Sequence, residues 1–216
     1  GSGAPTFSGS IVHVQNEYDL DTGPSGATSV FSGSTLDIKG GGFALLKAGT
    51  TLDFAGNAIL YDEGQVVLTG GSTLLFTGST NQFIITSNSI VSGSGTSEIM
   101  NGGPAGSLLF DNNGTVRGDV GFMTMDLGGT IWTNSFKIGR YSTSVSNATV
   151  QIRGSYNLQA GSTNKFFGPG LIWFFGNIVA ATNNGVFLVG DPDPAAGVLQ
   201  WDAVVYGAGV MNVVGT

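Results

Sequence analysis

Two aspartates stand at matching places in two copies of a short repeated phrase, where paired carboxylates could cleave a sugar chain. Asp37 follows Thr35-Leu36, and Asp53 follows Thr51-Leu52. Glycoside cleavage uses two acids that flank the scissile bond, one as a proton donor and one as a base or nucleophile. The two acids would form such a pair if the copies of the phrase stacked on adjacent coils of a repeat fold. A third copy has Leu75 at this place, so the pattern is incomplete.

Other groups that carry chemistry are sparse. His13 is the single histidine, and it alternates with apolar residues in Ile11-Val12-His13-Val14, which favours an ordinary strand residue over a member of a catalytic triad. The absence of cysteine excludes disulfides, thiolate metal sites and thiol catalysis. We therefore expect a protein that is not an enzyme, with no bound metal and no cofactor. Polysaccharide cleavage by Asp37 and Asp53 is the enzymatic alternative.

Aromatic residues form a second candidate site. Trp173 and Phe175 lie in the most apolar segment of the chain, and Trp132 lies in another predicted strand. Sugars present apolar faces to aromatic rings, so these three side chains, together with Asp37 and Asp53, are the candidate ligand-binding residues for a glycan. Packing in the core or in a subunit interface is the alternative explanation for the same rings.

The charge balance excludes several classes of partner. The chain has 14 acidic and 7 basic residues, and only 10% of its residues are charged. Its few Lys and Arg are scattered, so we expect no nucleic acid as partner, because binding of phosphates needs clustered cations. The longest apolar stretch, residues 171–181, is much shorter than the ~20 residues that span a bilayer, so we also expect no membrane insertion.

The turns between the predicted strands repeat. Gly-Ser-Thr or Gly-Thr-Thr precedes an apolar segment at Gly33, Gly49, Gly71, Gly78 and Gly161. Repetition of one turn-and-strand unit is typical of solenoids. The clearest predicted strands are 11–14, 35–39, 43–46, 51–54, 58–61, 66–69, 73–77, 82–86, 107–110, 131–133, 149–152, 171–175, 186–189 and 203–206.

The spacing of the phrase favours a parallel β-helix. Strands between residues 31 and 91 begin about every seven or eight residues, which is tighter than the ~8 to 12 residues of hairpin sandwiches. Three such strands make a coil of about 22 residues, and Gly49 and Gly71 are 22 residues apart. Gly33 and Gly49 are 16 residues apart, which does not fit this period. We predict an all-β parallel β-helix or related β-solenoid, with a β-sandwich or jelly-roll as the alternative.

Three regions are predicted along the chain. Residues 1–30 lack the phrase and are interpreted as an N-terminal cap or arm. Residues 31–190 form a repetitive β domain, which the Gly- and Ser-rich residues 93–106 could interrupt. Residues 191–216 begin with two prolines, which cannot donate to a ladder, and are interpreted as a strand-rich C-terminal cap or swapped arm.

The repeated phrase, the Gly-, Ser- and Asn-rich composition and the lack of Cys resemble the β-solenoid shafts of phage tail spikes and fibres, over roughly residues 31–190. The resemblance implies a homotrimer or filament on a virion surface or outside a cell, often one that contacts cell-surface glycans. We accordingly predict a non-enzymatic structural or receptor-binding component of a virion or extracellular appendage that self-assembles. The alternative is a sandwich-fold subunit of an extracellular filament, whose strand at 198–205 or 210–214 completes the sheet of a neighbour.

Overall fold

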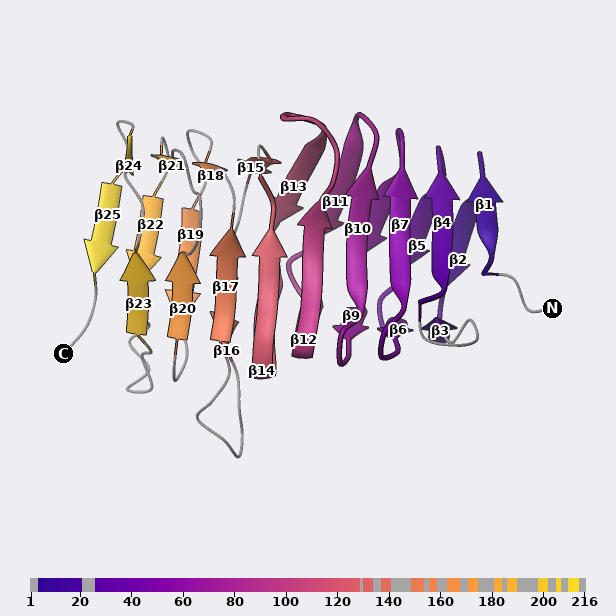
Figure 1. Ribbon diagram of the computed structural model, residues 1–216, viewed down its shortest axis with the longest axis horizontal. Helices are drawn as coiled ribbons and strands as arrows, with labels where there is room; N and C mark the ends of the chain where they lie inside the picture. Colours follow the sequence, from indigo (N-terminus) through magenta and orange to yellow (C-terminus); the bar gives the residue numbers. More distant parts are fainter. Residues whose placement is uncertain are drawn as a thin grey trace.

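A computed structural model of the chain shows an all-β parallel solenoid with three faces (Figure 1). It describes the backbone of residues 4–20, 26–128, 130–133, 137–140, 149–153 and the later strands as far as residue 213. Side chains are described for residues 4–17, 26–128, 130 and 150–152. Every strand pair found in this part of the chain is parallel, which confirms the predicted parallel β-helix.

The strands occur in the chain order first face, second face, third face. The first face contains β1 (Thr6–Ser8), β4 (Thr28–Ser32), β7 (Thr51–Ala55), β10 (Thr73–Thr77), the second half of β12 (Ile90–Asn101), the second half of β14 (Thr115–Asp126), β17 (Thr149–Arg153), β20 (Leu171–Phe174) and β23 (Val198–Trp201). The second face contains β2 (Ile11–Val14), β5 (Thr35–Ile38), β8 (Ile59–Asp62), β11 (Asn81–Ile85), β13 (Leu108–Asn112), β15 (Thr130–Thr133), β18 (Tyr156–Leu158), β21 (Ala181–Asn183) and β24 (Val205–Tyr206).

The third face contains β3 (Glu17–Leu20), β6 (Phe43–Leu46), β9 (Gln65–Leu68), the first halves of β12 and β14, β16 (Lys137–Arg140), β19 (Thr163–Phe167), β22 (Val186–Val189) and β25 (Val210–Val213). β12 and β14 run through the corner between the third and first faces, so these two faces form one 16-stranded sheet beside the separate 9-stranded second face. The coils follow one another along the long axis, from indigo to yellow in Figure 1. The described residues contain no helix, and therefore no helix that is long and apolar enough to cross a membrane.

The repeated phrase marks corners of the solenoid. Gly33, Gly49, Gly71 and Gly78 all have positive φ, a conformation that only glycine adopts without strain. In the copies at Gly33, Gly49 and Gly71 the next residue turns inward and is buried, and Ser34 and Thr50 donate hydrogen bonds to the carbonyls of Ser32 and Lys47. In these three copies the following Thr begins a strand, whereas after Gly78 the strand begins at Asn81.

The irregular spacing has a geometric cause. Gly49 and Gly71 both precede strands of the first face, and Thr51 of β7 pairs with Thr73 of β10, 22 residues later. Gly33 precedes β5 on the second face, two corners before β7. The spacing of 16 residues between Gly33 and Gly49 therefore covers two faces of one coil and does not break the repeat.

A row of stacked phenylalanines forms part of the core. On the first face the rings of Phe7, Phe31, Phe54 and Phe76 follow one another at centroid distances of 4.5, 5.3 and 5.2 Å. Phe31, Phe54 and Phe76 are fully buried. The stack then crosses to the second face, because Phe76 lies 5.4 Å from Phe83, which lies 5.3 Å from Phe110. Leu, Ile, Val, Ala and Met residues at the neighbouring inward positions fill the rest of the described core.

The structure bears on three sequence-based expectations about organisation. Residues 93–106 were expected to interrupt the repeat, but β12 continues through Asn101 and pairs along its length with β14. Residues 6–20 are not set apart as a cap, because β1, β2 and β3 form a coil in register with β4, β5 and β6. Near the other end β23, β24 and β25 likewise continue the three faces. The sandwich alternative is wrong, and with it the sandwich-fold filament subunit.

Candidate functional site

The two candidate catalytic acids do not form a pair. Asp37 lies in β5 on the second face, and Asp53 lies in β7 on the first face. Each is flanked by buried inward residues, Leu36 and Ile38 in one strand and Leu52 and Phe54 in the other. Both carboxylates therefore lie on outer surfaces, with the core between them. The expected stacking on adjacent coils is wrong, because the two copies of the phrase that carry them belong to different faces.

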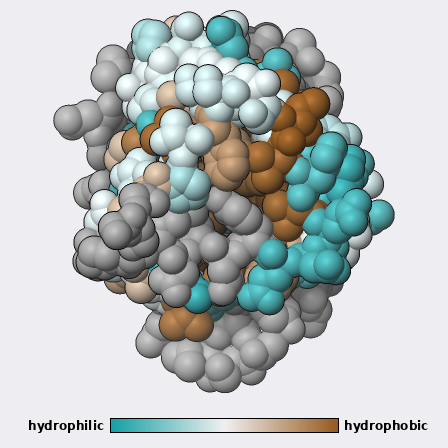
Figure 2. All heavy atoms as spheres, turned by 90° about the vertical axis from the view of Figure 1, so that its right-hand side faces the viewer, coloured by the Kyte–Doolittle hydropathy of each residue, from teal (hydrophilic) through white to brown (hydrophobic). Residues whose placement is uncertain are grey.

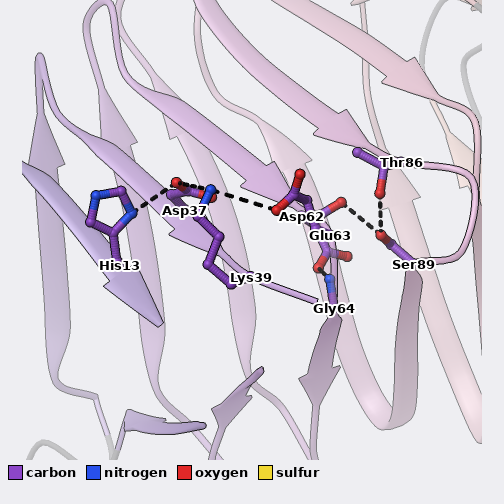
Figure 3. A network of polar contacts seen from close by, with 8 residues as sticks. All are labelled: His13, Asp37, Lys39, Asp62, Glu63, Gly64, Thr86 and Ser89. Atoms are coloured by element: carbon purple, nitrogen blue, oxygen red, sulfur yellow. Dashed lines mark hydrogen bonds and ion pairs between the residues drawn. The ribbon is translucent and has the colours of Figure 1, made fainter. Parts of the chain in front are cut away.

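Asp37 is instead the centre of an ionic network that joins neighbouring coils (Figure 3). Its Oδ2 atom accepts hydrogen bonds from Nδ1 of His13 and from Nζ of Lys39, each at 2.8 Å. His13 is in register with Asp37 in the neighbouring strand β2. Lys39 also lies 3.5 Å from a carboxylate oxygen of Glu63, one coil further on. The network thus spans three coils.

Burial and charge define what this network can do. Only 8% of Asp37 is exposed, whereas more than half of the His13 side chain is exposed. The Oδ1 atom of Asp37 is buried and has no hydrogen-bond partner in the described structure. The hydrogen bond to Asp37 raises the pKa of the Lys39 amine above its ordinary value of 10.5, and the nearby charge of Glu63 acts in the same direction. Lys39 therefore stays charged and bridges the two acids.

The contact between His13 and Asp37 has the donor and acceptor of a catalytic dyad but lacks a nucleophile. The carboxylate orients the ring through Nδ1, which leaves Nε2 as the free nitrogen. Among the described residues no hydroxyl is hydrogen bonded to this second nitrogen. A hydrolytic dyad needs such a group within reach. The arrangement is that of a hydrogen bond that joins two coils.

Asp53 makes a simpler contact. Its Oδ1 atom accepts a hydrogen bond of 2.7 Å from the Thr77 hydroxyl, in the next coil of the first face. In the ladder Asp53 is in register with Leu75, as the alignment of the phrase predicts. A row that contains one acid and one leucine cannot supply two carboxylates to a substrate.

Asp62 is the acid that sequence reasoning passed over. It ends β8, is fully buried at the corner between the second and third faces, and accepts a hydrogen bond of 2.9 Å from the Gly64 N–H. Its second carboxylate oxygen has no partner in the described structure. Burial raises the pKa of Asp62 from 3.8 to about 7, although the bond from Gly64 opposes the shift. The signal in the sequence is the Asp-x-Gly spacing, which recurs as Asn112-x-Gly114.

The corner of the next coil packs against Asp62. The hydroxyl of Ser89 donates to the backbone carbonyl of Asp62 at 2.7 Å, and it lies 2.8 Å from the hydroxyl of Thr86 (Figure 3). These hydroxyls hold the backbone of the corner and leave the free carboxylate oxygen without a partner. The Asp62 carboxyl group is therefore buried in the wall of the solenoid, out of reach of a substrate.

The aromatic candidates fall on two sheets. Trp132 lies in β15 of the second face, in register with the buried Phe110 of β13. Trp173 lies in β20 of the first face, in register with Gln151. Phe175 lies outside the described residues, and side chains are described at neither tryptophan. A shared glycan platform formed by these residues stays a prediction.

Neither similarity to known proteins nor a cluster of metal-binding side chains among the described residues indicates an activity. No family model matches the sequence, and comparison with curated proteins and with solved structures gives no significant match. In the part of the chain that the structure describes, no three His, Cys, Asp or Glu side chains are placed to hold a metal ion together. The fold and the contacts described above are therefore the basis for a functional proposal.

Proposed function

We propose that this chain is a non-enzymatic structural or receptor-binding component of a virion or extracellular appendage, in which the solenoid is a rigid rod. The observation that supports this most strongly is the unbroken parallel ladder with a stacked aromatic core. Each coil is fixed to the next by three sets of strand pairs, and on the first face also by contacts between Phe31, Phe54 and Phe76. Such a body resists bending, because every coil is bonded to both neighbours.

The surface chemistry of the rod suits binding to other macromolecules better than it suits catalysis. The two acids that were candidates for catalysis are engaged in contacts between coils, Asp37 with His13 and Asp53 with Thr77. The low charge of the chain reduces the cost of removing water where surfaces meet. A cell-surface glycan is the proposed ligand of a receptor-binding role, with Trp132 and Trp173 as the residues to test.

Immunogold electron microscopy tests this function in its natural setting. An antibody raised against the chain is applied to cells of the source organism and to particles released from them. We expect label on virions or on surface appendages. Label confined to the cell interior would contradict the proposal.

Glycan binding and glycan cleavage are separated by one panel of polysaccharides. We expect no cleavage by the wild type, and we expect that any binding falls in Trp132→Ala or Trp173→Ala but persists in Asp37→Asn and Asp53→Asn. Cleavage that is lost in either of the two acid variants would overturn the non-enzymatic proposal.

A further inference from the structure

The outer surface of the third face is apolar in its middle. Along β6 and β9 inward and outward positions alternate, and the inward side chains are buried. Four outward positions on this face carry apolar side chains that stay partly exposed, namely Phe43, Leu45, Val67 and Ile90. A sheet face that meets only water usually carries polar side chains at such positions. The end-on view of the rod in Figure 2 shows hydrophobic side chains that reach the surface at several places beside hydrophilic ones.

Strand register places these four side chains together. Leu45 of β6 is in register with Val67 of β9, one coil further on. Phe43 lies beside them in β6, and Ile90 lies at the start of β12, in register with Gln65. The four residues form one apolar patch across three coils. A contiguous apolar patch on the surface of a protein commonly marks a contact with another macromolecule.

Charged residues of opposite sign lie on either side of the apolar patch. In the coil before it, β3 carries Glu17 and Asp19. Beyond the patch, Lys137 of β16 is in register with Thr115, and Lys165 of β19 is in register with Lys137. The row of register positions that contains Glu17 therefore reaches two lysines on the far side of the patch.

Several other charged side chains near the patch form pairs within the chain. Lys39 and Glu63, at the corner between the second and third faces, belong to the ionic network of Asp37. The Nε atom of Arg117 in β14 lies 2.8 Å from a carboxylate oxygen of Asp119. The third face thus runs from an acidic coil through an apolar middle to two basic coils.

We propose that this face is a contact between two copies of the chain, which lie antiparallel with their third faces together. The two-fold axis runs along the strand direction between β9 and β12, so it reverses the rod but keeps the position along each strand. Glu17 of one copy then meets Lys137 of the other, and the apolar patches overlap. A two-fold contact must be self-complementary in this way. A parallel arrangement, as in the trimer that the resemblance to tail spikes implies, would place Glu17 beside Glu17 and Lys137 beside Lys137.

The size of the contact indicates a weak association. The six strands from β3 to β16 are ~4.8 Å apart and ~13 Å long, so they cover roughly 400 Å² on each copy. Two copies together bury about 800 Å², which is at the low end for protein interfaces. We therefore expect a dissociation constant on the order of micromolar or weaker. The proposal deepens the expected self-assembly and rests on the proposed function only for its biological setting.

Analytical ultracentrifugation of the purified chain, over concentrations from below micromolar to millimolar, tests the contact. Val67→Lys places a charge in the apolar patch. Ile84→Lys is the matched control, because Ile84 is also an outward, partly exposed residue within a strand, β11 of the second face. We expect dimers of the wild type and of Ile84→Lys, and dimerisation weaker by about tenfold or more in Val67→Lys. A wild type that is monomeric at every concentration would overturn the proposal, as would loss of dimers in Ile84→Lys alone.

Exchange of the two charges tests the orientation with variants that leave the apolar patch intact. In the antiparallel pair Glu17→Lys and Lys137→Glu each bring like charges together, so we expect each to weaken dimerisation by about fivefold or more at low salt. The double variant restores opposite charges and should dimerise like the wild type. In a parallel pair, like charges already face each other in the wild type. Single variants that dimerise like the wild type, or a double variant that is no better than either of them, would therefore contradict the antiparallel contact.

This proposal and the proposed function can fail separately. A monomeric chain would remove the contact between copies and leave the immunogold labelling of virions or appendages unaffected. Label confined to the cell interior would contradict the proposed function and leave the dimerisation of the purified chain unaffected.

Discussion

Asp62 and Asn112 occupy the same place at one corner of the solenoid, two coils apart. Both are in register with Ile85, which lies between them in the ladder. Each accepts a hydrogen bond of 2.9 Å from the N–H of the glycine two residues later, Gly64 or Gly114. Both side chains are fully buried. The same corner thus accommodates a carboxylate in one coil and a neutral amide in another, and only the carboxylate can charge.

We predict that Asp62→Asn stabilises the protein above neutral pH. The folded-state pKa of Asp62 is about 7, above the ordinary value of 3.8. Below pH ~4 this carboxyl group does not oppose folding. The free energy of unfolding falls as the pH rises through 7, because the buried carboxyl group must then ionise. The full loss for the wild type is about 4 kcal/mol. Urea denaturation of both proteins from pH 4 to pH 9 measures it.

The difference between the two proteins is the informative quantity, because burial also raises the pKa of Asp119 and gives the wild type a second pH dependence of the same sign. We expect the two stabilities to converge near pH 4 and to separate up to about pH 8. A constant difference across this range would show that Asp62 does not titrate inside the corner. Asn112→Asp is the reciprocal variant, and it should acquire the pH dependence that Asp62→Asn loses.

Gly64 and Gly40 differ in whether the structure leaves space for a side chain. A Cβ on Gly64 would overlap the backbone carbonyl of Gly42 in the preceding coil, whereas the nearest atom to a Cβ on Gly40 is 3.9 Å away. Neither residue has positive φ, so the contrast is one of space. We expect Gly64→Ala to lose about 2 kcal/mol or more, in the range of overpacked sites, and Gly40→Ala to change stability by less than about 0.5 kcal/mol. Equal thermal midpoints of the two variants would contradict the close approach of the coils.

The phenylalanine stack should dominate the stability of the first face. Phe54 is fully buried between Phe31 and Phe76, so Phe54→Ala should cost about 3–5 kcal/mol from lost burial and the cavity left behind. Phe122 is 50% exposed in β14 and is the control, with an expected change within about 0.5 kcal/mol for Phe122→Ala. Chemical denaturation of both variants measures the contrast. Similar losses in the two variants would mean that the stack is not the core of this face.

The fold was largely predictable from the sequence because the turn chemistry is local. A glycine with positive φ, an inward hydroxyl and a strand-initiating Thr are all written in the phrase, as at Gly71-Ser72-Thr73. Which face a copy belongs to is not local. Gly33 and Gly49 begin similar copies of the phrase but stand at different corners, with β5 and β6 between them.

The high glycine content of residues 93–106 led to the prediction of a break in the repeat, whereas β12 continues to Asn101. Gly93 is buried within β12, and a Cβ there would overlap the Ser97 hydroxyl and the Met123 side chain. Gly95 has positive φ at the corner through which the strand passes. These glycines serve packing and a bend within a continuous strand, whereas by composition alone they indicate a loop.

The candidate site was predictable in part. The sequence singled out Asp37 as a candidate for catalysis or glycan binding, but its contact with His13 comes from a neighbouring coil, and register places His13 beside it. The pairing of Asp37 with Asp53 failed because it assumed one face for both. Asp62 was missed because an acid in a turn is normally exposed, and only the three-dimensional corner buries it.

Cryo-electron microscopy of the purified chain, at a resolution that separates strands, tests the central claim that this protein is a rigid parallel solenoid rod. The account predicts an elongated particle with three flat faces and rungs about 4.8 Å apart, so that the 9-stranded second face extends over roughly 38 Å. A compact particle with two facing sheets, or with antiparallel strands, would contradict it.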